Sequence, residues 1–180
     1  MSAREDGWKA RLWWHGLQPN PDFPNGRNGA ALAKLRRAHS WVEAAAVPET
    51  ITLFRKLEKK HERDLPRVAV VAAVLAHVRE ENKNGSVAGS IGKAPNDSET
   101  RAVLSELRLG RLLSVSGDDD ILIAFRRLVA LMGKTANVAD LAEQILYWDH
   151  REWGDRHRVN FAFNYWQAGD AAPALTPATE

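Results

Sequence analysis

Nearly every apolar run in this chain of 180 residues repeats at the spacing of an α-helix. Ile121, Phe125 and Leu128, for example, recur at intervals that place them on one helix face. No segment alternates apolar and polar residues before a tight turn, as the strands of a β-hairpin would. The sequence therefore predicts an all-α fold without a sheet, with about eight helices.

The expected helices are separated by segments rich in Gly, Pro and Asn. Pro66 suits the first turn of a Val- and Ala-rich helix, and Asn137 can cap another. Asp149 and Glu152 have the spacing of a capping box, which indicates where the last helix begins. The predicted helices cover, approximately, residues 4–17, 30–46, 49–61, 67–81, 98–113, 118–132, 138–148 and 150–167.

Apolar stripes on these helices define the expected core. The first helix is expected to bury Trp8, Leu12 and Trp13. The expected stripe of the second helix is Leu32, Leu35, His39, Val42 and Ala46, and that of the last helix is Val159, Ala162, Phe163 and Trp166.

Two irregular segments, over residues 18–29 and 82–97, interrupt the helical pattern. The second predicts a division into an N-terminal helical bundle over residues 1–82, a Gly-rich basic linker over 83–97 and a C-terminal helical bundle over 98–167. A disordered tail is expected over residues 168–180, which are rich in Ala, Pro and Thr. Each half is near the lower size limit for a self-sufficient core, so the two small bundles should pack together.

The chain contains no Cys, which excludes disulfides, thiolate zinc sites, iron–sulfur clusters and Cys nucleophiles. This composition suits a cytoplasmic protein. No apolar stretch approaches the roughly 20 residues that span a bilayer. The charged N-terminus has no apolar run behind it, so no signal peptide and no membrane partner are expected.

Catalytic motifs such as Gly-x-Ser-x-Gly and His-Glu-x-x-His are missing from the sequence, and no cofactor or metal is expected. The Gly-rich loop that ends at Lys93 resembles a phosphate loop, but Val87 and Ala94 occupy positions where a Walker A motif needs Gly and Ser or Thr. His150 and His157 are seven residues apart and can share a helix face. With acidic neighbours they leave a small metallo-hydrolase open as an alternative.

Arginine pairs are the strongest candidates for a binding role. Arg36 and Arg37 are adjacent on one expected helix, and Arg126 and Arg127 on another. The apolar stripes exclude both pairs, so their guanidinium groups are expected to reach solvent, where they suit phosphate oxygens. The basic residues between 55 and 63 alternate with acids instead and are interpreted as helix-spaced ion pairs.

The aromatic residues allow two interpretations. Seven Trp are present, and several lie near the C-terminus, where they can stack on bases or pack in a core. As anchors for another protein they would fit a second candidate function, a helical adaptor that binds protein and has no affinity for nucleic acid.

Short motifs follow one another along the chain in a definite order. They are Trp13-Trp14-His15-Gly16-Leu17, Leu35-Arg36-Arg37-Ala38, Phe54-Arg55-Lys56-Leu57, Ser90-Ile91-Gly92-Lys93, Ser98-Glu99-Thr100-Arg101, Leu112-Leu113, Phe125-Arg126-Arg127-Leu128-Val129, Leu146-Tyr147-Trp148, Trp153-Gly154-Asp155-Arg156-His157-Arg158 and Phe161-Ala162-Phe163-Asn164-Tyr165. This ordered set resembles one known family, the small subunit of the type I-E CRISPR surveillance complex Cascade, called CasB. The resemblance runs from about residue 8 to residue 166, and its specificity comes from the ordered set. The segment over residues 18–29 departs from the family pattern.

This resemblance implies a non-catalytic subunit that contacts guide RNA and target DNA and helps to hold the displaced strand of the R-loop. It implies as partners the backbone and large subunits of Cascade and a second copy of the chain itself. The basic positions that match the family are the expected nucleic-acid-binding residues: Arg36, Arg37, Lys93, Arg101, Arg126, Arg127, Arg156 and Arg158.

Overall fold

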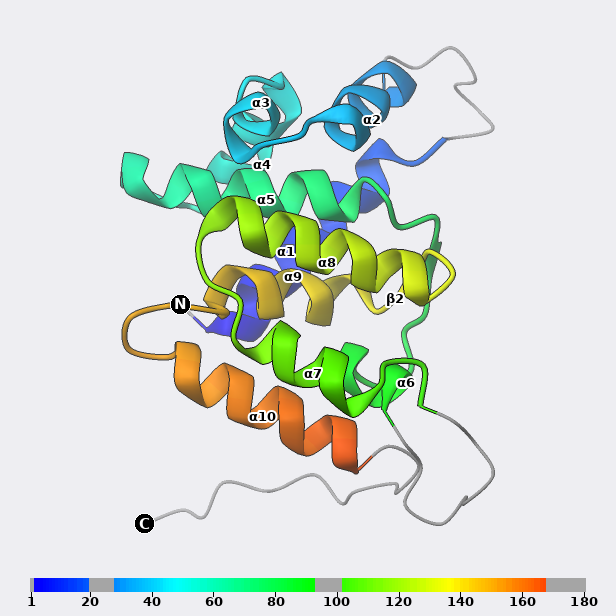
Figure 1. The fold of residues 1–180 in the computed structure, drawn as a ribbon. Coiled ribbons are helices and arrows are strands. Elements are labelled where there is room, and N and C mark those ends of the chain that lie inside the picture. The colour runs from blue at the N-terminus through cyan, green and yellow to red at the C-terminus, as the bar shows by residue number, and fades with distance from the viewer. Residues whose placement is uncertain (1, 20–27, 93–101, 168–180) are drawn as a thin grey trace.

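Helices form almost all of the regular structure in the computed structural model of the chain, which describes residues 2–19, 28–92 and 102–167. The prediction of an all-α fold is confirmed (Figure 1). The elements are α1 (Ala3–Leu17), α2 (Asn28–Arg37), α3 (Trp41–Ala45), α4 (Pro48–Lys56), the 3-10 turn η1 (Glu62–Asp64), α5 (Leu65–Leu75), β1 (Glu80–Glu81), α6 (Val87–Ile91), α7 (Glu106–Leu113), α8 (Asp118–Leu131), β2 (Thr135–Ala136), α9 (Val138–Tyr147) and α10 (Gly154–Trp166).

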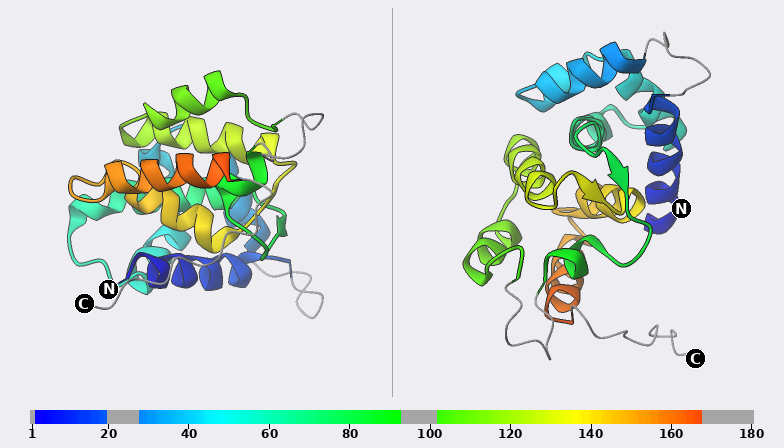
Figure 2. Two further views of the ribbon diagram at one scale, coloured as in Figure 1. Left: turned by 90° about the horizontal axis from the view of Figure 1, so that it is seen from below. Right: turned by 90° about the vertical axis from the view of Figure 1, so that its right-hand side faces the viewer.

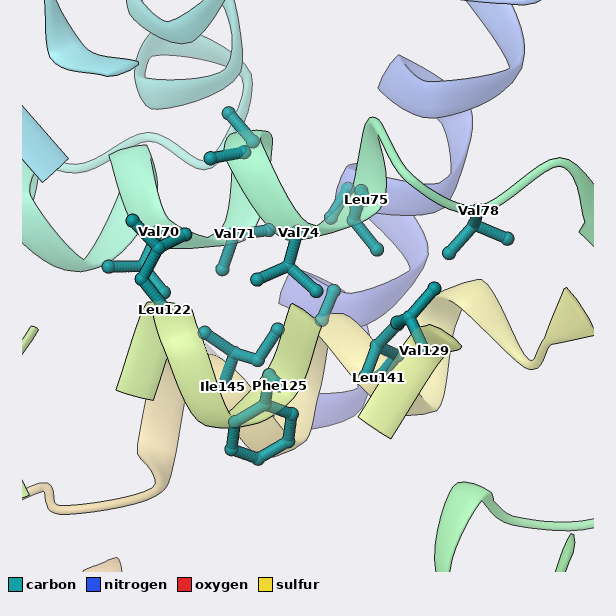
Figure 3. Close-up of a cluster of buried hydrophobic side chains, with 14 of the residues drawn as sticks. Val70, Val71, Val74, Leu75, Val78, Leu122, Phe125, Val129, Leu141 and Ile145 are labelled. Carbon is teal, nitrogen blue, oxygen red and sulfur yellow. The ribbon is translucent and has the colours of Figure 1, made fainter. Parts of the chain in front are cut away.

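Helix α5 lies at the centre of the molecule, and its side chains from Val68 to Leu75 are all buried. Helices α2, α3 and α4 pack on one side of it, and α8 and α9 on the other (Figure 1). Figure 3 shows Val74 of α5 above Phe125 of α8 and Ile145 of α9. Small β-branched residues on α5 let several helices approach it at once, which explains its Val- and Ala-rich sequence.

Helix α1 packs along α9, so helices from the two ends of the chain share a core (Figure 2). At Gly7 the helices are so close that an added Cβ would lie 2.5 Å from the carbonyl oxygen of Ala139. The buried carboxylate of Asp6 accepts hydrogen bonds from Lys59 Nζ at 2.8 Å and Tyr147 Oη at 2.7 Å. The bundle boundaries expected from the sequence stay a prediction.

Two short strands are an addition to the expected fold. Glu80 and Glu81 of β1 pair in parallel with Thr135 and Ala136 of β2. They follow the C-terminal ends of α5 and α8. After α5, which ends at Leu75, we expected helix up to residue 81. Two residues in each strand are too few for sequence alternation to reveal them.

The helix expected over residues 30–46 is two helices. Helix α2 ends at Arg37, and Ser40 then caps α3 by accepting a hydrogen bond from the Glu43 backbone N–H at 3.3 Å. The Glu43 carboxylate accepts from the His39 backbone N–H at 2.8 Å. As a result His39, Val42 and Ala46 are exposed, and the prediction that they belong to the core is wrong.

The expected buried face of α1 is also partly wrong. Trp8 and Leu12 are exposed, by 51% and 43%, whereas Trp13 and Trp14 are buried. The helix turns its Gly7–Ala10 side toward α9 because these small residues permit close packing.

Helix α10 reverses the expected stripe. Val159, Phe163 and Trp166 are exposed, and Phe161 and Tyr165 are buried instead. Both faces of this helix carry apolar residues, so periodicity alone could not choose between them. Asp149 does not cap α10. Its Oδ1 lies 2.5 Å from Arg67 Nη2, and its Oδ2 accepts a hydrogen bond from the Gly117 backbone N–H at 3.0 Å.

The remaining elements differ from expectation mainly at their ends. Helix α4 ends at Lys56, α7 begins at Glu106, and the expected linker contains the short helix α6, capped by Ser86. The expected cap of α9 is confirmed, because Asn137 accepts a hydrogen bond from the Asp140 backbone N–H. The tail over residues 168–180 lies outside the described residues.

Candidate nucleic-acid interface

Two arginines connect the C-terminal ends of α2 and α5 with helix α8. Arg36 donates through Nε to the carbonyl of Ala76 at 2.6 Å. Arg126 donates to the carbonyls of Ala38 at 2.6 Å and Leu35 at 2.9 Å. The last carbonyls of a helix lack partners within the helix and carry partial negative charge. These guanidinium groups therefore stabilise the helix junction.

The expectation that both arginine pairs point to solvent is wrong for one member of each pair. Arg36 and Arg126 are partly buried, and burial lowers the pKa of both guanidinium groups. Arg37 and Arg127 are exposed. Successive helix residues are about 100° apart around the axis, so one member of a pair can face inward while the next faces solvent.

A neutral histidine lies among these cations. Burial, together with the charges of Arg126 and Arg36, lowers the pKa of His77 from 6.5 to about 4. The charge of Lys134 also lowers the pKa of His77, and the charge of Arg79 lowers the pKa of Arg36. The Arg79 backbone N–H donates to the Lys134 carbonyl at 2.8 Å, which places these two loops side by side.

We call Arg36, His77, Arg79, Arg126 and Lys134 the His77 cluster. The charge of Glu43 raises the pKa of Arg126, whereas burial lowers it. Within the described part of the chain, however, no carboxylate forms an ion pair with any of the four cations. The side chains of Arg79 and Lys134 are exposed. The cluster thus combines two partly buried guanidinium groups with two exposed cations that an anion can reach.

Sequence analysis missed Arg79 and Lys134. Each is a single basic residue in a loop, 55 positions from the other. Only the pairing of β1 with β2 brings them together. The helix predicted over residues 67–81 included Arg79, whereas α5 ends at Leu75, so nothing in the sequence indicated that Arg79 would meet Lys134.

The other expected binding residues lie elsewhere. Arg127 faces a groove between α7 and α8, where Arg108 and Arg111 also lie. At the start of α10, Arg156 is exposed, and Arg158 forms an ion pair with Asp155 at 2.6 Å. Lys93 and Arg101 lie outside the described residues.

The histidines considered for a metal site both lie next to Tyr147. The ring of His157 stacks on that of Tyr147 with centroids 5.3 Å apart, and the His150 ring lies at 5.9 Å. Burial, with the charge of Arg156, lowers the pKa of His157. Over residues 2–19, 28–92 and 102–167, no three His, Asp or Glu side chains gather as a metal site would require.

A search for membrane spans over the same residues found no helix long and apolar enough to cross a bilayer.

A comparison with models of known protein families gave a match. The family model described as CRISPR-associated protein Cse2 matches residues 31–166, about three quarters of the chain. The comparisons with curated proteins and with solved structures gave no match.

Proposed function

Because the chain belongs to the Cse2 family of CRISPR-associated proteins, which are subunits of Cascade, we propose that it is the non-catalytic, nucleic-acid-binding small subunit of a type I-E complex. In this role it contacts the guide RNA and target DNA and stabilises the R-loop. Its partners are the backbone and large subunits and a second copy of itself, and it acts in the cytoplasm.

The His77 cluster is the observation that carries this proposal. Its four cations have no ion-pair partner in the described part of the chain, and Arg79 and Lys134 are open to solvent. Phosphate oxygens would supply the missing negative charge and accept hydrogen bonds from the guanidinium group of Arg79. Such contacts are independent of base sequence and become weaker as salt concentration rises.

Contacts of this kind are sufficient to influence an R-loop. The RNA–DNA heteroduplex is about as stable as the DNA duplex that it replaces, so small contributions from protein–backbone contacts decide the balance. Base pairing with the guide already selects the sequence. A helical subunit that contacts only phosphates therefore stabilises the R-loop in this proposal without recognising bases.

The eight basic positions expected from the sequence contribute differently in this proposal. Arg37 and Arg156 are exposed and available to phosphates, and Arg127 is exposed at the groove between α7 and α8. Arg36 and Arg126 add charge from within the helix junction. Arg158 is weakened as a candidate by its pairing with Asp155. Lys93 and Arg101 remain candidates on the resemblance alone.

Add-back of the subunit tests the proposal. Cascade is reconstituted without this chain, with the wild-type chain, or with the R79A/K134A variant, and the lifetime of the R-loop on target DNA is measured. We expect the wild type to lengthen the lifetime and the variant to lose most of that gain. The matched control is R55A/K56A, which removes two exposed cations from α4 and should behave as wild type.

An equal gain from R79A/K134A and the wild type would remove the His77 cluster from the interface. Absence of any gain from the wild-type chain would overturn the R-loop role itself.

The exposed apolar side chains of α10 favour a second candidate function. Val159, Phe163 and Trp166 expose 66%, 50% and 45% of their surface on one helix, which suits contact with protein. If the chain is only a protein adaptor, R-loop lifetime will depend on its presence but not on Arg79 or Lys134, and assembly will depend on Phe163.

A further inference from the structure

Helices α7 and α8 lie side by side (Figures 1 and 2) and enclose an open groove of about 550 Å³. Helix α7 packs on α10 but makes little contact with the backbone of α8. The side chains of Leu104, Leu112 and Leu128 are 2–6% exposed and form the floor. The remaining apolar lining consists of Val115, Ala124, Ala130 and Leu131.

Three arginines form the rim of this groove. Arg108 and Arg111 are three positions apart on α7 and so share a helix face, and Arg127 lies opposite on α8. All three are exposed, and none forms an ion pair with a carboxylate of residues 2–19, 28–92 or 102–167. An occupant that complements both parts must combine apolar surface with negative charge.

Nucleic acid and protein can both combine apolar surface with negative charge, and the residues that line the groove favour protein. Among the lining residues that the structure describes, a nucleobase would find no aromatic ring to stack on and, apart from the arginines, no polar side chain for its edges. The hydrogen-bond donors and acceptors of the base would lose their bonds to water without gaining others, which costs binding free energy. A leucine or phenylalanine side chain has no such groups, and adjacent carboxylates can reach the rim arginines.

We propose that this groove is the docking site for an acidic, amphipathic helical segment of another Cascade subunit. Apolar side chains of that segment enter the groove, and flanking Asp or Glu residues pair with Arg108, Arg111 and Arg127. Helix-in-groove binding of this kind places apolar anchors at intervals of three and four residues.

This inference rests on the proposed membership in Cascade but not on phosphate binding by the His77 cluster. It also changes the role of Arg127, which the sequence placed with the nucleic-acid-binding residues. In the structure Arg127 shares an apolar groove with two other arginines, so its carboxylate partners come from protein.

Photo-cross-linking in the assembled complex tests the proposal. A photoreactive amino acid replaces Leu131, which lines the groove and is 41% exposed. The control position is Ile123, which is on the same helix, 42% exposed and outside the groove lining. We expect position 131 alone to cross-link a subunit segment in which an apolar residue has Asp or Glu within one helical turn.

A cross-link from position 131 to nucleic acid, to a second copy of this chain or to a segment without carboxylates overturns the proposal. So does a yield of protein cross-link no higher than that from position 123. None of these results depends on Arg79 or Lys134, so failure here is distinguishable from failure of the proposed R-loop contacts.

Charge reversal provides the second measurement. The R108E/R111E variant should enter the complex at least tenfold less efficiently than wild type, while circular dichroism shows the native helix content. Replacing the acids of the cross-linked segment with Lys should restore entry. Normal entry of R108E/R111E, or failure of the Lys replacement to restore it, contradicts the docking site.

Discussion

Adjacent arginines in this protein have different roles, and the structure explains why. Arg126 donates to two carbonyls at the end of α2, and its Nε is buried without a hydrogen-bond partner among the described residues. Arg127 is exposed on the groove rim. Replacing both together would therefore confuse loss of binding with loss of stability.

The single variants separate these effects. We expect R126A to lower the free energy of unfolding by about 2 kcal/mol, because two charge-assisted hydrogen bonds are lost and two carbonyls are left without partners. R127A should change it by less than about 0.5 kcal/mol. Urea denaturation of both variants checks this difference, and equal stability of the two would refute the junction role of Arg126.

His77 gives the protein a specific dependence on pH. The pKa of His77 is about 4 in the folded protein and 6.5 as the ordinary value. Between these values the unfolded chain binds more protons, so stability is highest above pH 6.5 and falls as pH decreases toward 4. The variant H77Q is neutral throughout, so it should lose less stability than wild type between pH 7 and pH 5.

Urea denaturation at both pH values measures this difference. Because other groups titrate equally in both proteins, the difference between wild type and H77Q isolates His77. An identical loss in the two proteins would show that His77 titrates normally.

At the scale of elements, helix positions were more predictable than helix faces. Asn137 and the acids that follow Gly117 indicated the starts of α9 and α8 correctly. Ser40 and Glu43 also carry the spacing of a capping box, a signal that could have revealed the break between α2 and α3. The apolar stripe across the break was continuous, which hid it.

Helix faces depend on which neighbours a helix meets, and this information is not local. Both faces of α10 are apolar, and Phe161 and Tyr165 became the buried side, with Tyr165 Oη donating to the carbonyl of Leu104 at 2.5 Å. A buried hydroxyl needs such a partner. The choice of face therefore follows from a tertiary contact between residues 61 positions apart.

The contact between α1 and α9 predicts a large effect at Gly7. A Cβ there would lie 2.5 Å from the Ala139 carbonyl oxygen, so G7A should force the helices apart and cost about 1–3 kcal/mol. The control G110A, in α7, meets no atom within 4 Å and should stabilise the protein by about 0.5–1 kcal/mol through helix propensity.

Thermal or urea denaturation of G7A and G110A measures both effects. If G7A is as stable as wild type, the close packing of α1 on α9 is incorrect.

For the whole molecule, the predicted fold class is confirmed, whereas the sequence indicated only two of the four cations of the His77 cluster, the surface that we propose for phosphate binding. The His77 cluster forms because α2, α5 and α8 end near one another. The strands β1 and β2 then align the two loops that precede them, which hold Arg79 and Lys134. Arg36 and Arg126 were recognisable as paired cations, but Arg79 and Lys134 become neighbours only in the folded chain. When charged residues from separate loops lie together, the topology of the fold has placed them there. The spacing of apolar residues along the sequence does not predict such a surface.

The central claim, that this subunit binds nucleic acid through the phosphates, is tested most directly by salt dependence. Affinity for R-loop DNA is measured with reconstituted Cascade containing the wild-type or the R79A/K134A chain, from about 50 to 300 mM salt. We predict a weaker variant whose log–log slope is smaller in magnitude by about 1.4 to 1.8, because two phosphate contacts are lost. Equal slopes and equal affinities for the two complexes would contradict the account.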